Sequence, residues 1–218
     1  LFEEVCKLFM TGHAARTWDA LQRFQLTRAL FPVLEGNSGS GQARAGKLLI
    51  QALRNTDERI AVEKSVTPAF LLAAILWQPV RARADALQAT GLNEYAALGE
   101  AADEVMSKQV QRTSIPRRFS VFTRQIWTMQ PRFRNTRGRR AKSLLQERRF
   151  RAGYDFLLLR AVEDESLQAL CDHWTEAQKG VKLNTGQRRV GDRHGNDSRR
   201  RPHRRGRRRA APSTATKT

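Results

Sequence analysis

The side chains best able to do chemistry in this sequence are arginines, and they are concentrated in two segments. Residues 117–160 include 13 basic and 2 acidic residues, and residues 187–218 include 12 basic and 2 acidic residues. Arginine supplies 23 of these 25 basic residues. A guanidinium pairs with phosphate through two hydrogen bonds and stacks on nucleobases. The pattern therefore predicts a polyanion-binding chain, with RNA as the leading candidate for its partner.

Other patterns could support catalysis, but each lacks a required part. Residues 41–47 match a phosphate-binding loop until Leu48 replaces the Ser or Thr that would hold Mg²⁺. Cys171 and His173 offer two zinc ligands where a structural site needs four. The acidic run at 163–165 stands where a helix begins, which favours capping over metal binding. The sequence therefore predicts no catalytic residue, no metal site and no cofactor bound by this chain.

The alternative explanation for residues 117–160 is a solvated helix face. Such faces normally pair their cations with acids four residues away, and only two acids are present here, so nucleic-acid binding is favoured. The candidate RNA-binding residues are Arg117, Arg118, Arg124, Arg132, Arg134, Arg137, Arg139, Arg140, Lys142, Arg148, Arg149 and Arg151. The candidate polyanion-binding residues of the tail are Arg199, Arg200, Arg201, Arg204, Arg205, Arg207, Arg208 and Arg209.

Composition limits the class of protein. Cys6 and Cys171 show no framework spacing, which favours two core thiols in a reducing, cytoplasmic setting. The longest apolar run, residues 69–77, is far shorter than the roughly 18 residues needed to cross a bilayer, so no membrane span is expected. Leu1 already lies within an amphipathic pattern, and we therefore expect the chain to be part of a longer protein.

The periodicity of apolar residues is helical, without sustained strand-like alternation, and predicts an all-α fold. Apolar stripes indicate helices at residues 2–9, 18–25, 45–53, 69–77, 101–110, 119–129, 141–161 and 167–174. Thr67 and Ser114, each followed closely by proline, are expected to cap the helices that follow them. A surface loop is expected at 35–41, and Pro131 should interrupt a helix. Residues 187–218 lack periodicity and are expected to be disordered.

Several blocks of this sequence resemble one enzyme family. They are Leu1-Phe2-Glu3-Glu4, Leu30-Phe31-Pro32, Asn55-Thr56-Asp57, Pro68-Ala69-Phe70-Leu71, Ile115-Pro116-Arg117-Arg118-Phe119, Ile126-Trp127, Phe150-Arg151-Ala152 and Tyr154-Asp155. In this order they resemble the C-terminal part of bacterial poly(A) polymerases, in the nucleotidyltransferase superfamily shared with CCA-adding enzymes. Gly153 departs from the alanine usual in the family.

The resemblance implies an array of helical neck, body and legs. Residues 1–113 would form the neck and body, residues 114–186 a basic helical RNA-binding region, and residues 187–218 a disordered Arg-rich tail. The parent protein would add AMP from ATP to 3′ ends of single-stranded RNA. Its ATP and Mg²⁺ would be held by a catalytic head, normally in the same chain, whose residues have no counterpart here. The alternatives are the body of a CCA-adding enzyme and a free-standing RNA-binding adaptor.

Overall fold

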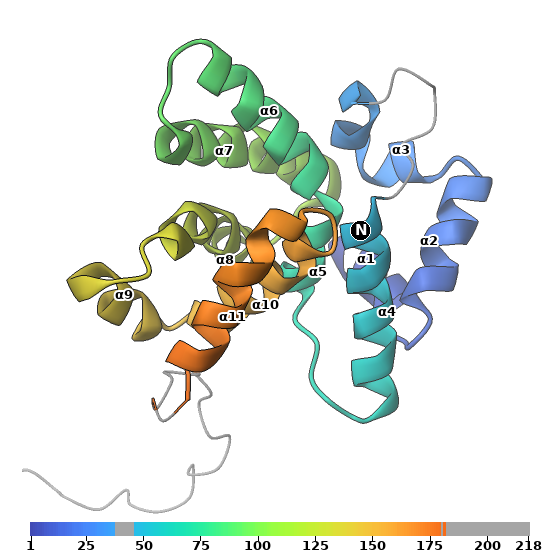
Figure 1. Cartoon of the computed structure of the whole chain (residues 1–218). Helices are drawn as coiled ribbons and strands as arrows, with labels where there is room; N and C mark the ends of the chain where they lie inside the picture. Colours follow the sequence, from blue (N-terminus) through green and yellow to red (C-terminus); the bar gives the residue numbers. More distant parts are fainter. Residues whose placement is uncertain (38–45, 180, 182–218) are drawn as a thin grey trace, which may run out of the picture. The chain divides into compact units, whose positions relative to one another are not determined.

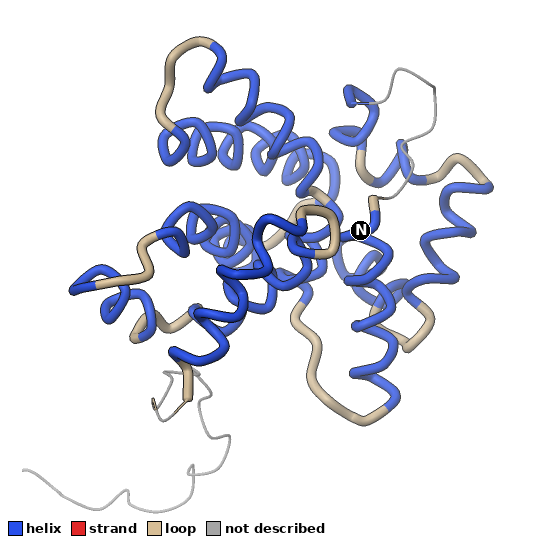
Figure 2. The backbone as a smooth tube through the Cα atoms, viewed as in Figure 1, coloured by secondary structure: helices blue, strands red, loops and turns tan. Residues whose placement is uncertain are grey.

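The computed structural model describes residues 1–37, 46–179 and 181, and all regular structure within them is helical (Figures 1 and 2). The α-helices are α1 (Phe2–Phe9), α2 (Ala14–Arg23), α3 (Thr27–Leu30), α4 (Lys47–Ala61), α5 (Pro68–Ile75), α6 (Trp77–Ala89), α7 (Glu94–Thr113), α8 (Arg117–Met129), α9 (Gly138–Leu145), α10 (Phe150–Ala161) and α11 (Gln168–Ala177). The 3₁₀ helices are η1 (Pro32–Asn37), η2 (Gln130–Arg134) and η3 (Glu165–Leu167). The all-α prediction is confirmed, whereas the predicted disorder of residues 187–218 and the tail arginines lie outside the described residues.

Helix α5 is the central element, as its uniformly apolar sequence predicts. Pro68 stands in its first turn, where the missing N–H costs nothing, and Ala69 and residues 71–75 are buried. The helix packs against α4, α6, α8 and α10 (Figure 1). An element that is apolar on every side is stable only when other helices surround it.

Helix α8 is attached to α5 by two buried hydrogen bonds in addition to its apolar face. Thr123 donates through Oγ1 to the carbonyl of Ala69 at 2.9 Å, and Trp127 donates through Nε1 to the carbonyl of Ala73 at 3.0 Å. Both pairs are spaced by four residues, so they recur on one face of each helix. A backbone carbonyl has two lone pairs and can accept a second donor. The rotation of α8 about its own axis is thereby fixed.

Two helix N-termini are capped by carboxylates from distant parts of the chain. Asp57 on α4 accepts hydrogen bonds from the backbone N–H groups of Ala14 and Ala15 at 2.6 and 3.1 Å. Glu163 accepts one from the N–H of Leu48 at 2.8 Å. These contacts satisfy N–H groups that a helix leaves unpaired and place negative charge at the positive end of its dipole.

The cap on α4 explains the phosphate-loop pattern at residues 41–47, of which residues 41–45 lie outside the described part. The side chain of Glu163 fills the N-terminus of this helix, and a Cβ at Gly46 would overlap its Oε1 and the amide of Gln78. A carboxylate of the chain itself thus lies where the pattern would place a phosphate. The capping interpretation of the acidic run is confirmed, since Asp164 also accepts a hydrogen bond from the N–H of Ser166 at the start of η3.

Thr67 is the N-cap residue of α5, as expected, and Pro68 follows it in the first turn, but the Thr67 side chain makes no capping hydrogen bond. The cap expected at Ser114 is wrong. Ser114 ends α7 in the left-handed region, with φ 51°, and Pro116 occupies the N-cap position of α8. Asn93 caps α7 through a 3.0 Å hydrogen bond from the N–H of Ala96. Of the loop expected at 35–41, residues 35–37 belong to η1, and residues 38–41 lie outside the described part of the chain.

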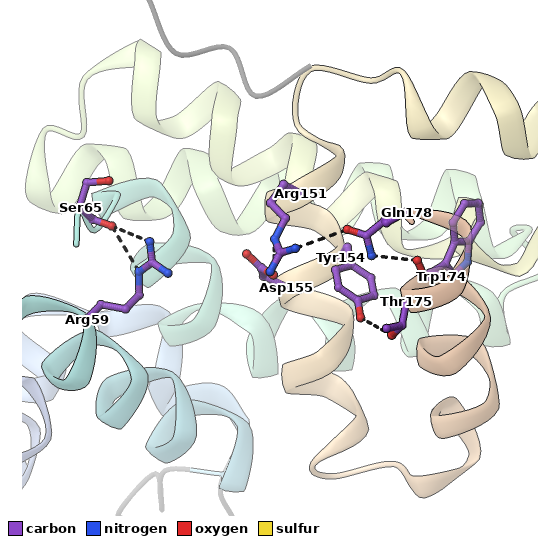
Figure 3. Close-up of polar contacts among 8 residues, drawn as sticks. All are labelled: Arg59, Ser65, Arg151, Tyr154, Asp155, Trp174, Thr175 and Gln178. Atoms are coloured by element: carbon purple, nitrogen blue, oxygen red, sulfur yellow. Dashed lines mark hydrogen bonds and ion pairs between the residues drawn. The ribbon is translucent and has the colours of Figure 1, made fainter. Parts of the chain in front are cut away.

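A second apolar cluster holds the C-terminal helices. It is centred on four aromatic side chains, Phe133, Phe150, Tyr154 and Trp174. Trp174 donates through Nε1 to the carbonyl of Phe133 at 2.8 Å. The Tyr154 hydroxyl lies 2.6 Å from Oγ1 of Thr175, as Figure 3 shows. As Pro131 predicts, the α-helical pattern stops at Met129 and continues as η2. The boundary expected between residues 113 and 114 stays a prediction.

Two helical glycines should respond oppositely to alanine. A Cβ at Gly153 would overlap Sδ of Met129 and lie 3.4 Å from Cε2 of Phe133, whereas at Gly99 it would meet nothing within 4 Å. Overpacking costs about 1–3 kcal/mol, and alanine improves a helix interior by about 0.5–1 kcal/mol. We expect Gly153→Ala to lower the free energy of unfolding and Gly99→Ala to raise it, as measured by urea titration of both variants. Stabilisation by Gly153→Ala would contradict this packing.

Candidate nucleic-acid interface

The predicted RNA-binding residues come from α8, η2, α9 and the start of α10. Helix α8 has two faces: Thr123, Ile126 and Trp127 are buried against the core, whereas Arg118 and Val121 are exposed. Because the buried face is tied to α5, the exposed face is held in one orientation. The interface is therefore supported by packed helices from residue 117 onward.

Four of the predicted arginines are paired with carboxylates. The pairs are Arg124 with Asp103, joined by two hydrogen bonds of which Nη2–Oδ2 is 2.7 Å, Arg132 with Glu147 at 2.8 Å, Arg134 with Glu94 at 3.0 Å and Arg151 with Asp155 at 2.9 Å. Burial raises the pKa of Asp155, and the adjacent Arg151 opposes that rise. Arg151 also reaches Gln178 at the end of α11, at 3.5 Å (Figure 3). Three of the pairs join different elements and the Arg151 pair lies within α10, and the charge of all four arginines is partly neutralised.

The other predicted cations have no carboxylate partner within residues 1–37, 46–179 and 181. They are Arg117, Arg118, Arg137, Arg139, Arg140, Lys142, Arg148 and Arg149. All of them except Arg149 are exposed. Cations whose charge no carboxylate neutralises can pair with phosphates, so the structure divides the predicted set into two classes that the sequence does not distinguish.

Arg149 has a special environment. Its guanidinium carbon lies 3.8 Å from the centre of the Phe122 ring, which is a cation–π stack. Burial lowers the pKa of the guanidinium, and the neighbouring Arg148 lowers it further. An arginine nevertheless stays protonated at neutral pH. The stack therefore presents a positive charge on a flat, half-buried support.

A groove of about 350 Å³ lies between the N-terminus of α7, the exposed face of α8 and the turn before α10. Its lining is Tyr95, Arg118, Val121, Phe122, Gln125, Thr128, Met129, Arg132, Glu147, Arg148 and Arg149. The lining thus includes four arginines and a single acid, and Glu147 is already paired with Arg132. This composition favours an anionic ligand that also has a flat apolar part.

The sequence analysis missed the aromatic contribution to this groove. Tyr95 is 58% exposed, and Phe122, which the periodicity assigns to the core face, is only half-buried. Tyr95 lies two residues after the N-cap Asn93 and outside the buried stripe of α7. An exposed aromatic ring at this position could have been inferred from the sequence. Its proximity to α8 is a tertiary contact that no local pattern reveals.

Arg160 ends the basic segment but is not part of its surface. Its guanidinium lies 5.2 Å from the centre of the Trp77 ring and 3.3 Å from Oε1 of Gln130. Burial lowers the pKa of Arg160 to about 10. Its Nε is buried without a hydrogen-bond partner in the described part of the chain. This half-buried arginine packs between helices, unlike the exposed cations of the segment.

The remaining chemically notable side chains have structural surroundings. Cys171 is buried with Sγ 3.9 Å from the carbonyl of Leu157, and His173 packs edge-on against Trp174. Both cysteines are free thiols. Among the described residues, no three His, Cys, Asp or Glu side chains are grouped as metal ligands would be. Within the same part of the chain, every helix is too short or too polar to cross a membrane.

The amino-acid sequence of this chain matches two family models and several known proteins. Residues 90–210 match the family model "Polymerase A arginine-rich C-terminus", and residues 1–37 match the model "Probable RNA and SrmB- binding site of polymerase A". The chain is 37% identical over 182 residues to poly(A) polymerase I of Salmonella typhi, and the aligned region covers 82% of this chain and 39% of that protein. The corresponding protein of Escherichia coli O157:H7 is 36% identical with the same coverage, and that of Haemophilus influenzae is 33% identical over 181 residues. The chain spans about two fifths of the length of these relatives.

The two classes of arginine should differ in RNA binding. Each phosphate contact contributes about −0.7 to the slope of log K against log salt for single strands. We expect Arg140→Gln to reduce the magnitude of this slope by about that amount, because Arg140 is unpaired. The matched variant Arg124→Gln should change the slope by much less, because Asp103 already holds that guanidinium. Filter binding of oligo(A) at several salt concentrations measures both slopes, and equal losses would refute the division.

Proposed function

Because this chain belongs to the bacterial poly(A) polymerase family, whose arginine-rich C-terminal region it matches, we propose that it holds RNA for a polynucleotide adenylyltransferase. The complete enzyme would add AMP from ATP to RNA 3′ ends. In this proposal the described helices supply a binding surface, and ATP and Mg²⁺ are bound by a catalytic head outside these residues. The role of the chain in the reaction is to position the substrate.

One observation carries the proposal: seven exposed cations on α8, α9 and the connecting turns have no carboxylate partner in the described part of the chain. Six of the seven are arginines, which pair with phosphate through two parallel hydrogen bonds. They project from a backbone that is already packed on the core, so little conformational entropy is lost in ordering this surface when RNA binds. The family model matched by residues 1–37 also has RNA in its name, which supports the same partner.

The alternatives are the body of a CCA-adding enzyme and a free-standing RNA-binding adaptor. The curated relatives carry the name poly(A) polymerase I, which favours the first reading over both. Supplying the intact protein with ATP alone, and then with CTP plus ATP, separates the two enzymes. An adenylyltransferase extends RNA with ATP alone and gains no ordered CCA product from added CTP.

Binding of single-stranded RNA by the 218-residue chain should depend strongly on salt. Contacts to several phosphates release as many counterions, so affinity should fall by at least ten-fold between roughly 50 and 200 mM salt. Fluorescence anisotropy of a labelled oligo(A) at several salt concentrations measures this dependence. Affinity that stays constant across this range would contradict the proposed surface.

Catalysis should require the head. We expect no AMP transfer by the 218-residue chain, and restored tailing when a poly(A) polymerase head from a relative is fused before Leu1.

In the fused protein, replacing Arg139, Arg140, Arg148 and Arg149 with Gln should lower the tailing rate even at saturating RNA, if these side chains direct the 3′ end. Incorporation of labelled ATP reports each rate. Labelled product from the unfused chain above a contaminant control, or normal tailing by the Gln variant, would overturn this expectation.

A further inference from the structure

We infer that the groove lined by Tyr95, Phe122 and Arg149 is a binding pocket for one unpaired nucleobase of the RNA. The inference rests on the proposed function and deepens it, because it assigns to one place on the basic surface a contact with a base in addition to contacts with phosphates. Such base contacts are made by stacking. The stacking contribution to affinity is much less sensitive to salt than the contribution of phosphate contacts.

Two flat groups in the groove are suited to stacking. Tyr95 is 58% exposed, and its hydroxyl has no hydrogen-bond partner among the described residues, so much of its side chain is available to a ligand. The guanidinium of Arg149 is supported from behind by Phe122 at 3.8 Å. Unpaired RNA bases are commonly stacked on aromatic rings and on guanidinium planes. Burying an exposed tyrosine ring against a base removes apolar area from water on both partners.

The surroundings of these groups fit a nucleotide better than an apolar ligand. Arg118 and Arg148 line the same groove without carboxylate partners, so they can hold the phosphates on either side of a stacked base. The exposed amide of Gln125 offers a donor and an acceptor to the base edge. Small-ligand pockets measure about 300–1,000 Å³. A groove of about 350 Å³ is at the lower end of that range and suits a single nucleotide.

Removing the ring at position 95 should separate base contacts from phosphate contacts. Tyr95 is exposed on the first turn of α7, so Tyr95→Ala leaves the core intact. The complete 218-residue chain is titrated with oligo(A) and with an oligonucleotide of equal length whose riboses carry no base. Stacking is worth roughly ten-fold in affinity per base. We expect Tyr95→Ala to weaken oligo(A) binding by about that factor and to leave binding of the abasic strand unchanged, because the tail and the exposed arginines contact both strands alike.

Two controls make the test specific. Tyr95→Phe keeps the ring and should keep the affinity for oligo(A), and Val62→Ala alters an equally exposed apolar side chain on the C-cap residue of α4, away from the groove lining, and should change neither affinity. As a direct readout, 2-aminopurine in the oligonucleotide should lose fluorescence on binding the wild-type chain, because stacking quenches it. Tyr95→Ala should remove much of that quenching at saturating protein.

The outcomes distinguish the pocket from the surface that contains it. If both strands bind with strong salt dependence but Tyr95→Ala affects them equally or not at all, the pocket is refuted and the RNA-binding surface stands. If neither strand shows salt-dependent binding, the proposed function itself fails. If an oligo-glutamate peptide binds more tightly than an oligonucleotide of equal charge and loses that affinity in Tyr95→Ala, the groove belongs to an acidic protein partner and the inference is overturned.

Discussion

The attachment of α8 to α5 is the constraint on which the rest of the structure depends. Helix α5 is buried on all sides, and two side chains of α8 donate hydrogen bonds to its carbonyls at Ala69 and Ala73. A buried donor without a partner costs about 1–3 kcal/mol, so the indole of Trp127 and the hydroxyl of Thr123 tolerate little rotation of α8. The same helix carries arginines on its outer face. The core of the molecule thus determines the direction in which the basic surface points.

The second constraint is the distribution of charge. A segment with 13 basic residues would repel itself if all its cations were gathered without partners. Two acids of helix α7, Glu94 and Asp103, reduce this repulsion by pairing with Arg134 and Arg124, and Arg160 is half-buried against Trp77, apart from the exposed cations. What remains exposed is a set of cations separated by helix geometry. Acids outside the basic segment therefore make its high charge compatible with a packed fold.

The sequence predicts the helices well because their stripes of apolar residues reflect burial directly. Helix α5 and the capping role of the acidic run are recovered from periodicity and local charge alone. Local patterns place Thr67 correctly at the N-cap of α5 but do not show that its hydroxyl makes no capping hydrogen bond. They fail at Ser114, which ends α7 in the left-handed region instead of starting α8. They also fail at the groove. Tyr95 and Phe122 belong to different helices, and a stripe that includes Phe122 cannot show that its ring lies under a guanidinium of another element.

The cap that Glu163 places on α4 can form only late in the synthesis of the chain. The hydrogen bond joins residues 115 positions apart, so α4 cannot acquire it until the segment after α10 has left the ribosome. At synthesis rates of about 5–20 residues per second, that wait is about 6–23 s. Asp57, which caps α2, is made only about 40 residues after that helix and is ready much sooner. The N-terminal helices therefore gain their two caps at different times, and the cap on α4 forms only after the helices of the basic surface have been synthesised.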